Sequence, residues 1–390
     1  MNVKGTKKAD KRVDIGYLSR LGIQSYGHNN LYPQELRAII EASPNGATCV
    51  ERRATYIEGN GLASQAMADS VCDLLGSTFD DVHHLISEDL AYYDGFALHI
   101  NYNVMGEVVS MSHIPFENCR LAEPDEEGFV HKVVVHPDWS GKRTRNGKAV
   151  KVSEENCDYI DVFNPDKAVV QQQIMKVGGI AFYKGQILYR TRAGKDTYCT
   201  PVADTVLPSM SGDEAISNVS CRNVRNNFLP AGILVTKKGQ SAEDVDNGFS
   251  NEIVKLQGDM NAVKILHIEI ESDEDIPEFK PFDGKNYDKE FTASSAKFID
   301  DIYARFNQEQ FARLRSGSIG FSGDLANDVK REYAEQVTKQ QRMITRAYRS
   351  VVEHWAMGVL PYQSVEDITI EPLVKSISDE QGGAKSSQSN

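Results

Sequence analysis

The middle of the chain constrains its architecture most. A polar-rich helical run, Asp213–Phe228, breaks at Leu229-Pro230-Ala231-Gly232, where proline and glycine interrupt helical periodicity. A short apolar strand follows, Ile233–Thr236, then a basic turn, and a second helical run extends from Ser241 to Leu256. Two helices joined by a small β segment are typical of a stalk with a tip. Their polar faces and few apolar residues favour packing against copies of the same chain, so we expect an assembly protein.

The composition is that of an ordinary folded protein. A chain of 390 residues is long enough for two or three regions with a core, and 40% hydrophobic and 25% charged residues are usual values. No apolar run approaches the ~18 residues that would suggest a membrane span. The lysine-rich start, Met1–Arg12, has no apolar core. We therefore expect no signal peptide, no anchor and no membrane partner.

The charge and the cysteines exclude some functions. A net charge of −13 argues against a broad basic surface that grips nucleic acid, but allows a wall past which DNA slides without sticking. The six cysteines form no CxxC pair and stand at no metal-ligand spacing with histidine. We expect free thiols in a reducing compartment. The cysteines are Cys49, Cys72, Cys119, Cys157, Cys199 and Cys221.

Helices precede strands in the first half of the chain. After a solvated arm at residues 1–30, helices are predicted at Gln34–Glu41, from Ser43-Pro44 to Gly59, and at Thr78–Tyr93, where Thr78 and Asp81 resemble a capping box. From Gly95 the apolar period changes to two, which predicts strands. Later strands are expected at Phe129–His136, at Tyr159–Phe163 and in a hairpin, Ile180–Tyr183 with Gln186–Arg190. This order predicts an α+β domain over residues 31–211.

The second half returns to helices. A strand is predicted at Ala262–Ile270, followed by a flexible stretch, Asp283–Lys289. A long amphipathic helix then carries apolar residues from Phe291 to Phe306. A Gly/Ser-rich break precedes the last major helix, Leu325–Trp355. Residues 359–390 are expected to form a tail that is largely disordered.

No motif in the sequence supports catalysis, a cofactor or a metal. His83-His84 cannot share a metal from adjacent helical positions, and both are expected on a helix surface. Gly141–Lys148 resembles a phosphate loop but has five residues between its glycines, and Ala149 stands where the hydroxyl residue should be. Gly320-Phe321-Ser322-Gly323 is one residue short of a nucleophile elbow. We expect no catalytic residue, no cofactor and no metal.

Two pairs of lysines stand out because each lies in a glycine-containing segment between regular elements. These are Lys237-Lys238 beside Gly239, and Lys285 with Lys289 beside Gly284. Exposed loops are the simpler interpretation of both. The functional alternative is occasional, salt-sensitive contact with a phosphate backbone.

The order of these segments resembles the tailed-bacteriophage portal protein family in its shorter form. The resemblance covers about residues 28–358 and rests on loose apolar patterns in a fixed order. The chain departs from the family after Phe306, where Asn307-Gln308 replaces a frequent proline. The matching segments are Asn30-Leu31-Tyr32-Pro33, the helix from Ser43-Pro44 to Leu62, Ile114–Arg120, Asn227–Leu234, and Ile302–Phe306 leading to Leu325-Ala326-Asn327.

The resemblance implies a portal-type subunit with an α/β wing, a two-helix stem, a small β clip and a C-terminal helical crown. The wing would be residues 31–211, continued by a strand in 261–282. Residues 212–260 would hold the stem helices and the clip, 229–240, and residues 261–323 would also hold the tunnel loop, 283–291, and the tunnel helix. The crown would be residues 324–358.

The resemblance also implies the partners. Identical copies would form a ring, usually of twelve, at one capsid vertex of the virion, assembled in the host cytoplasm. Double-stranded DNA would pass through it, and terminase, the major capsid protein and a head-tail adaptor would attach. The tunnel-loop residues implied to contact DNA are Lys285, Asn286, Tyr287 and Lys289. The clip residues implied to contact a neighbour or partner are Ile233, Leu234, Val235, Lys237 and Lys238.

Two alternatives remain at this stage. One is another virion structural subunit, such as a capsid or head-tail adaptor protein. The other is a cytoplasmic α+β enzyme, which the lack of a convergent His/Asp/Ser or metal set disfavours. Size in solution separates them, since a portal forms a large particle with a central hole.

Overall fold

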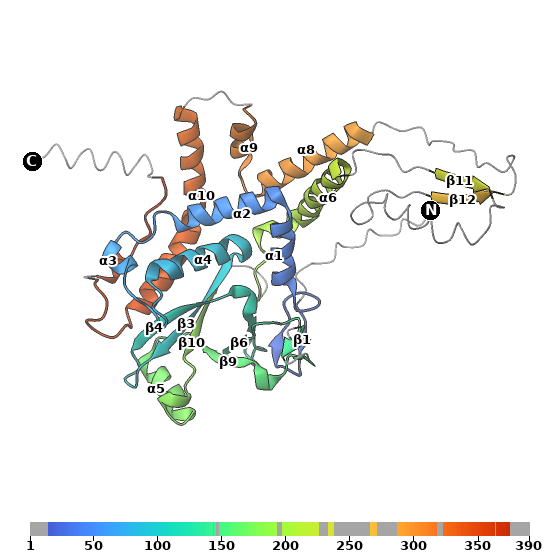
Figure 1. The fold of residues 1–390 in the computed structure, drawn as a ribbon. Helices are drawn as coiled ribbons and strands as arrows, with labels where there is room; N and C mark the ends of the chain where they lie inside the picture. Colours follow the sequence, from blue (N-terminus) through green and yellow to red (C-terminus); the bar gives the residue numbers. More distant parts are fainter. Residues whose placement is uncertain are drawn as a thin grey trace, which may run out of the picture. The chain divides into compact units, whose positions relative to one another are not determined.

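The chain divides into two units, one of which is inserted into the other. The computed structural model describes residues 15–142, 144–145, 148–192, 197–225, 233–237, 266–270, 287–317, 323–362 and 364–374 (Figure 1). Unit 1 comprises Met1–Met210 and Asp300–Asn390, and unit 2 is Ser211–Ile299. Unit 2 is therefore an insertion that begins and ends within the sequence of unit 1.

Unit 1 contains a six-stranded mixed sheet. The strand order is β4-β3-β10-β9-β6-β5, in which only β9 and β10 run parallel. Helices and a mainly antiparallel sheet in one unit confirm the α+β class. The strands are β3 (Gly95–Tyr102), β4 (Val108–Ile114), β5 (Cys119–Leu121), β6 (Lys132–Val135), β9 (Asp158–Val162) and β10 (Gln186–Thr191).

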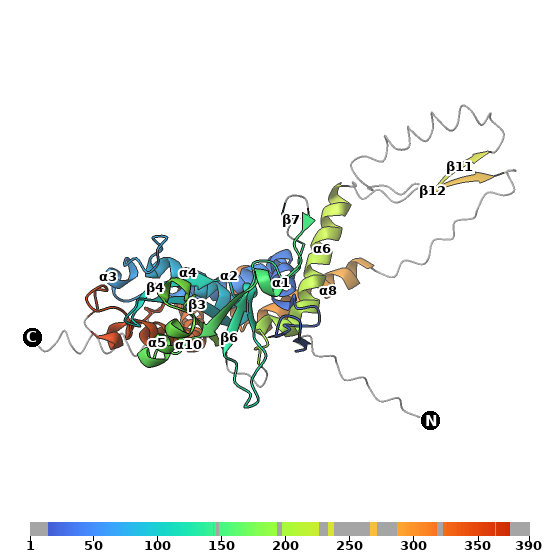
Figure 2. The ribbon, with the colours of Figure 1, turned by 90° about the horizontal axis from the view of Figure 1, so that it is seen from below.

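Helices pack in layers on this sheet. Helix α4 (Phe79–Tyr93) lies against β3 and β4, α2 (Pro44–Glu58) lies against α4, and α10 (Gly323–Val352) lies against α2 (Figures 1 and 2). The other helices are α1 (Tyr32–Ala42), α3 (Gln65–Ala68), α5 (Lys167–Lys176), α6 (Leu207–Arg225), α8 (Tyr287–Arg305) and α9 (Glu309–Ser316). The other strands are β1 (Tyr17–Leu18), β2 (Ile23–Gln24), β7 (Thr144–Arg145), β8 (Lys148–Ala149), β11 (Ile233–Lys237) and β12 (Leu266–Ile270).

The predicted helix starts have the expected local chemistry. The Ser43 side chain accepts a hydrogen bond from the Gly46 N–H, and Pro44 occupies the first turn of α2. Thr78 and Asp81 form the complete capping box of α4. Helix α8 ends at Arg305, and Asn307 has a left-handed φ of 54°. Asparagine tolerates that conformation, so it ends the helix without the proline that is common in the family that the sequence resembles.

The predicted hairpin Ile180–Tyr183/Gln186–Arg190 is wrong. Residues Ile180–Phe182 form a 3-10 helix, and only Gln186–Thr191 is a strand. That strand is central in the sheet, with β3 on one side and β9 on the other, so both of its edges are already paired. Gly185 is required at its start because a Cβ there would lie 2.3 Å from the Ile100 carbonyl oxygen.

The expectation of a solvated arm at residues 1–30 is wrong for residues 15–30. Leu21, Ile23 and Tyr26 are buried, and β2 lies beside β5 through a bridge between Ile23 and Ala122. The Tyr26 hydroxyl donates to the Cys199 carbonyl oxygen at 3.0 Å. This segment therefore closes one end of the sheet and belongs to the core.

The C-terminal segment is also more ordered than expected. Residues 364–374, here called the strap, return to the end of α2: the Asn60 N–H donates to the Glu371 carbonyl oxygen and the Glu371 N–H to Gly61. Arg349 of α10 donates to the carbonyl oxygens of Glu366 and Ile368. The prediction of a largely disordered tail is therefore wrong for the strap, which ties α10 to α2.

Buried polar groups include a histidine that we expected on the surface. His83 is fully buried, and its Nε2 lies 2.8 Å from the Glu58 carbonyl oxygen, whereas His84 is exposed as predicted. The six cysteines are free thiols, of which only Cys221 is exposed. Within the described part of the chain, no helix is long and apolar enough to cross a membrane.

Candidate functional site

The insertion starts and ends at one place in unit 1. Helix α6 carries the chain out of unit 1 after Met210, and α8 brings it back at Asp300. On the unit 1 side, the Ser209 hydroxyl donates to the Asp301 carboxylate at 3.2 Å. On the unit 2 side, a Cβ at Gly212 would lie 2.5 Å from the Phe298 ring. The lack of a side chain at Gly212 therefore allows α6 and α8 to approach closely.

Apolar side chains remain exposed on the unit 2 parts of both helices. Val219 of α6 is 42% exposed and Phe291 of α8 is 39% exposed. Asp213, near the start of unit 2, is buried. Helix α6 thus buries a polar group near the start of unit 2, and both helices expose an apolar side chain at positions further from unit 1 in the sequence.

The candidate clip residues lie in a two-stranded parallel sheet. Strand β11 contains Ile233, Leu234, Val235 and Lys237, and pairs with β12 from Ile233 opposite Leu266 to Lys237 opposite Ile270. Strand β12 is the end of the strand that the family resemblance gives to the wing. Lys238 lies outside the described residues, as does the second predicted stem helix, Ala242–Gln257. The predicted contacts of the clip residues stay predictions.

The candidate tunnel-loop residues fall at the start of a helix. Helix α8 begins at Tyr287, so Tyr287 and Lys289 are in its first turn and not in a loop. Lys285 and Asn286 lie outside the described residues. The proposed loop is therefore shorter than 283–291, because the sequence from Tyr287 onward, with Asp288 and Glu290, suits a helix N-terminus. Its contact with DNA stays a prediction.

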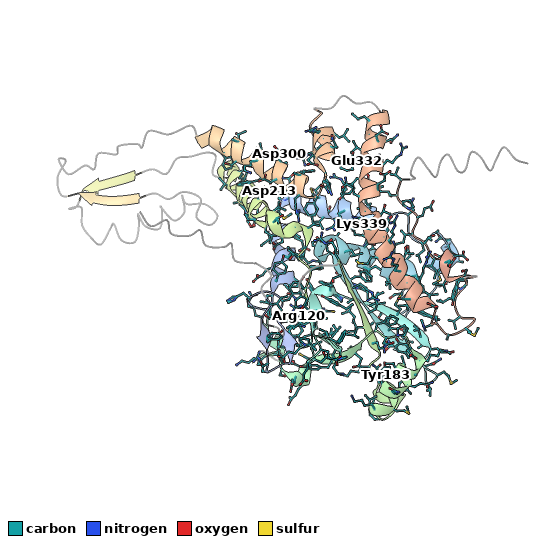
Figure 3. All side chains as sticks on the ribbon, turned by 180° about the vertical axis from the view of Figure 1, so that it is seen from behind. Arg120, Tyr183, Asp213, Asp300, Glu332 and Lys339 are labelled. Carbon is teal, nitrogen blue, oxygen red and sulfur yellow. The ribbon has the colours of Figure 1, made fainter. Side chains whose placement is uncertain are left out.

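Two of the segments that carry the family resemblance meet at Arg120. This side chain, labelled in Figure 3, is fully buried. Its Nε donates to the Asn30 side chain at 2.7 Å and an Nη to the Asn30 carbonyl oxygen at 2.6 Å. The other Nη donates to the carbonyl oxygens of Glu117 and Cys119. Burial lowers the pKa of Arg120. The junction holds Asn30 in its left-handed conformation, φ 62°, and so fixes the start of α1 on the sheet.

A second polar junction, centred on Gln308, was missed by sequence reasoning. Gln308 is fully buried, and its Nε2 donates to the Cys49 carbonyl oxygen and to the Tyr333 hydroxyl. Its Oε1 accepts from Arg52 at 2.8 Å. One glutamine thus connects α2, the turn after α8, and α10. The signal available in the sequence was the departure from proline at Asn307-Gln308.

The described residues offer no metal site. They contain no cluster of three or more His, Cys, Asp or Glu that could hold a metal. His113 and buried Asp89 form a pair at 2.7 Å, but Asp89 also accepts from the Phe116 N–H. Burial raises the pKa of Asp89. The pair fixes the turn after β4 against α4, which is a structural role.

Comparisons with known proteins give weak structural likenesses. No family model matches the sequence, and no curated protein matches it. A chain of the virion of a native gene transfer agent (GTA) particle is 13% identical, covering 91% of this chain and 88% of that chain, with a TM-score of 0.49. A chain in the neck of the native GTA particle, computed with C12 symmetry, has a TM-score of 0.48, 13% identity, and coverage of 91% and 89%. An HK97 family phage portal protein from Corynebacterium diphtheriae has a TM-score of 0.35, 12% identity, and coverage of 70% and 75%.

Proposed function

We propose that this chain is the repeating subunit of a portal-type ring that conducts DNA at one vertex of a viral capsid. The observation that carries the proposal is the insertion of unit 2, which is entered through α6 and left through α8 and contains the β11–β12 pair. Its described elements follow the order helix, strand, strand and helix. The first helix, the first strand and the last helix agree in order with the first stem helix, the clip and the tunnel helix that the resemblance implies, whereas the second stem helix lies outside the described residues and the resemblance gives the second strand to the wing.

Exposed apolar residues on the insertion support assembly. Val219 and Phe291 are large apolar side chains on helices, and each is more than one third exposed in a single chain. Fully burying such a side chain contributes about 1.5–3 kcal/mol, so covering the roughly 40% that is still exposed contributes about 0.6–1.2 kcal/mol each. If the neighbour is an identical copy related by a rotation that closes, the result is a ring. The ring would then cover the exposed parts of these two side chains.

The net negative charge of the chain suits a channel through which DNA must move. A net charge of −13 per subunit disfavours tight binding to phosphates, and a conduit must let DNA move. In this proposal the protein is not an enzyme, and a separate terminase supplies the energy for DNA packaging. The major capsid protein and a head-tail adaptor attach to the ring in the virion, and the ring assembles in the host cytoplasm. Ejected DNA leaves through the same channel.

Particle size tests the proposal. The purified full chain is examined by negative-stain electron microscopy and by sedimentation velocity over a range of protein concentrations. We expect rings with a central hole that persist on dilution. A particle that remains a compact monomer at every concentration would contradict the proposal.

The tunnel loop is tested separately. Because α8 begins at Tyr287, the deletion is limited to Asp283–Asn286, with a glycine linker in its place. We expect intact rings and impaired retention of DNA in particles. If rings fail to form, the segment is an assembly element and the assignment to the channel is wrong.

A further inference from the structure

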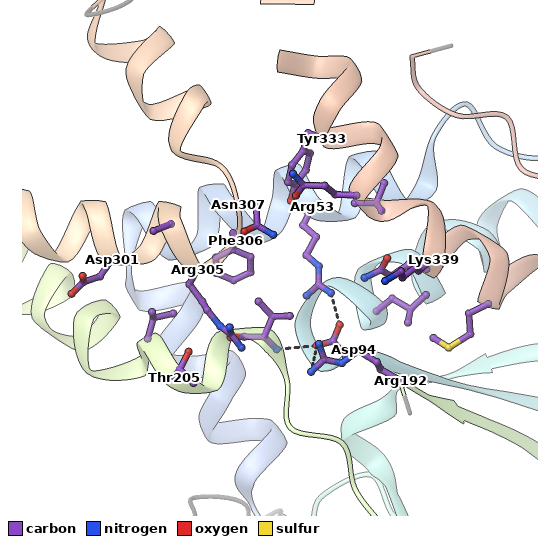
Figure 4. Close-up of a pocket in the computed structure, with 18 of the residues that line it drawn as sticks. Arg53, Asp94, Arg192, Thr205, Asp301, Arg305, Phe306, Asn307, Tyr333 and Lys339 are labelled. Carbon is purple, nitrogen blue, oxygen red and sulfur yellow. Dashed lines mark hydrogen bonds and ion pairs between the residues drawn. The ribbon is translucent and has the colours of Figure 1, made fainter. Parts of the chain in front are cut away.

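Unit 1 contains a cavity of about 830 Å³ that the proposed ring does not use. The end of α8, the middle of α10, the residues after β10 and the 3-10 helix η4 (Val202–Val206) line it (Figure 4). Four cationic side chains and two carboxylates are among the lining residues, so positive charge is in excess. This excess is local, because the chain as a whole is acidic.

The floor of the cavity is a neutralised carboxylate. Asp94 and Arg53 are both buried and form an ion pair. The Asp94 carboxylate also accepts from the Val202 N–H at 2.9 Å and lies 3.7 Å from an Nη of Arg192. Two guanidinium groups and one amide thus surround a single carboxylate. The floor therefore presents no free negative charge to the cavity.

The rim carries cations with unused donors. Arg305 donates from its Nε to the Val202 carbonyl oxygen at 2.7 Å, and its two Nη groups have no partner in the described residues. The ammonium of Lys339 likewise has no partner among the residues that the structure describes. The other carboxylate in the lining, Asp301, accepts from Ser209. Figure 4 shows Arg305, Lys339 and Arg192 on different sides of Asp94.

A second observation points to a ligand. Gln340 lines the same cavity, and its Oε1 is buried without a hydrogen-bond partner in the described residues. A buried acceptor without a donor costs about 1–3 kcal/mol. A hydroxyl group of a bound molecule would satisfy it. The cavity thus combines cationic donors with an unsatisfied acceptor.

We propose that this cavity binds a small phosphorylated molecule that also carries hydroxyl groups, of the size of a mononucleotide. Guanidinium and ammonium groups bind phosphate through charge-assisted hydrogen bonds. The volume lies within the range of about 300–1,000 Å³ that is usual for small-molecule sites. A recess of this size admits a mononucleotide and not a DNA duplex. The inference does not depend on the ring, since every residue that carries it lies in unit 1.

Calorimetry of the full chain tests the proposal, with ATP, inorganic pyrophosphate and adenosine as probes in magnesium-free buffer. We expect ATP to bind more tightly than pyrophosphate, and adenosine not to bind. Lys339→Gln and Arg305→Gln should each weaken ATP binding about tenfold, which is about 1.4 kcal/mol. Both side chains are exposed, so neither change should alter the thermal unfolding temperature.

The matched control is Lys330→Gln. Lys330 is exposed on the same helix, and nine residues at 100° each place it on the face opposite Lys339. It should leave ATP binding unchanged. Three results would overturn the proposal: no binding of ATP at millimolar concentration, equal weakening by Lys330→Gln, or binding of adenosine as tight as that of ATP.

Discussion

Unit 1 encloses a large apolar core of its own, although it also exposes side chains such as Leu74 and Leu75, whereas the described helical parts of unit 2 are long helices with partly exposed apolar residues. Unit 1 closes its core with its own residues: Phe96 and Ile100 of β3, Ile86 of α4 and Tyr348 of α10 are fully buried. The described helical parts of unit 2 leave Val219 and Phe291 partly exposed. A unit that buries its core gains its stability within one chain. A unit that exposes apolar side chains gains stability when another surface covers them.

The two units also differ in what fixes the contacts between their elements. In unit 1, Arg120 and Gln308 are buried and hydrogen-bonded on several sides, which fixes one arrangement of the surrounding elements. At the base of unit 2, close contact depends on the absence of a side chain at Gly212. Substitutions in unit 1 should therefore reduce the free energy of unfolding, and substitutions in unit 2 should mainly affect association.

The largest effect on unfolding is expected for Arg120→Met. The change removes donors from the side chain and carbonyl oxygen of Asn30 and from the carbonyl oxygens of Glu117 and Cys119, all within the core. We expect a loss of about 3 kcal/mol in the free energy of unfolding, because buried acceptors lose a charged donor. Urea denaturation measures it, with the exposed Arg20→Met as the control. Equal midpoints for the two variants would show that the junction is not structural.

A smaller effect is expected for Gly212→Ala. Alanine favours a helix by about 1 kcal/mol over glycine, but here its Cβ would lie 2.5 Å from the Phe298 ring. We expect faster hydrogen exchange in the unit 2 part of α6, with unchanged exchange in the sheet of unit 1. Phe298→Leu in the same chain should restore protection by removing the ring edge. A gain in protection from Gly212→Ala alone would mean that the two helices do not approach closely.

Acidic pH should weaken unit 1 through His83. Burial lowers the pKa of His83 below its ordinary value of 6.5, while the Glu58 carbonyl and the charges of Glu58 and Asp80 act in the opposite direction. The unfolded chain therefore binds a proton more readily than the folded one. Stability should be full above about pH 6.5 and fall as the pH drops below it.

The measurement is the unfolding temperature between pH 7 and pH 5. His83→Gln retains a donor for the Glu58 carbonyl and cannot titrate, so it should reduce the slope. His84→Gln is the control, because His84 is exposed. An unchanged slope in His83→Gln would assign the pH dependence to other groups.

The smallest effect on unfolding is expected for Phe291→Ser. This side chain is already 39% exposed, and substitutions of exposed residues usually change stability by no more than about 0.5 kcal/mol. Ring formation should nevertheless be lost or much reduced in sedimentation velocity. Val104→Ser, at an exposed apolar residue of unit 1, is the matched control and should leave rings intact. Loss of rings in both variants would remove the contrast between the units.

Local patterns in the sequence predicted most of the elements. Thr78 with Asp81 and Ser43 with Pro44 predicted the starts of α4 and α2, since each cap uses residues close in sequence. The hairpin at Ile180–Tyr183 was wrong because pairing in a central strand depends on β3 and β9, which lie far away along the chain. The packing of residues 15–30 and of the strap was missed for the same reason.

Only the order of the elements along the candidate site could be predicted from the sequence. Sequence reasoning located the strand at Ile233 and the helix that contains Phe291, and it extended the loop into the first turn of α8. It could not find the Arg120 and Gln308 junctions, because each joins segments from distant parts of the chain. The cavity beside Asp94 was missed for that reason too, since its lining comes from six separate segments.

The meeting of Ser209 and Asp301 has a practical consequence. These residues are hydrogen-bonded at 3.2 Å, and everything between them enters and leaves unit 1 at that one position. A short linker can therefore bridge them, and the whole of Ser211–Ile299 can be exchanged as a cassette for the corresponding segment of another protein. The remaining scaffold keeps its sheet, its junctions and its cavity, so grafted tips of different chemistry can be compared on one base.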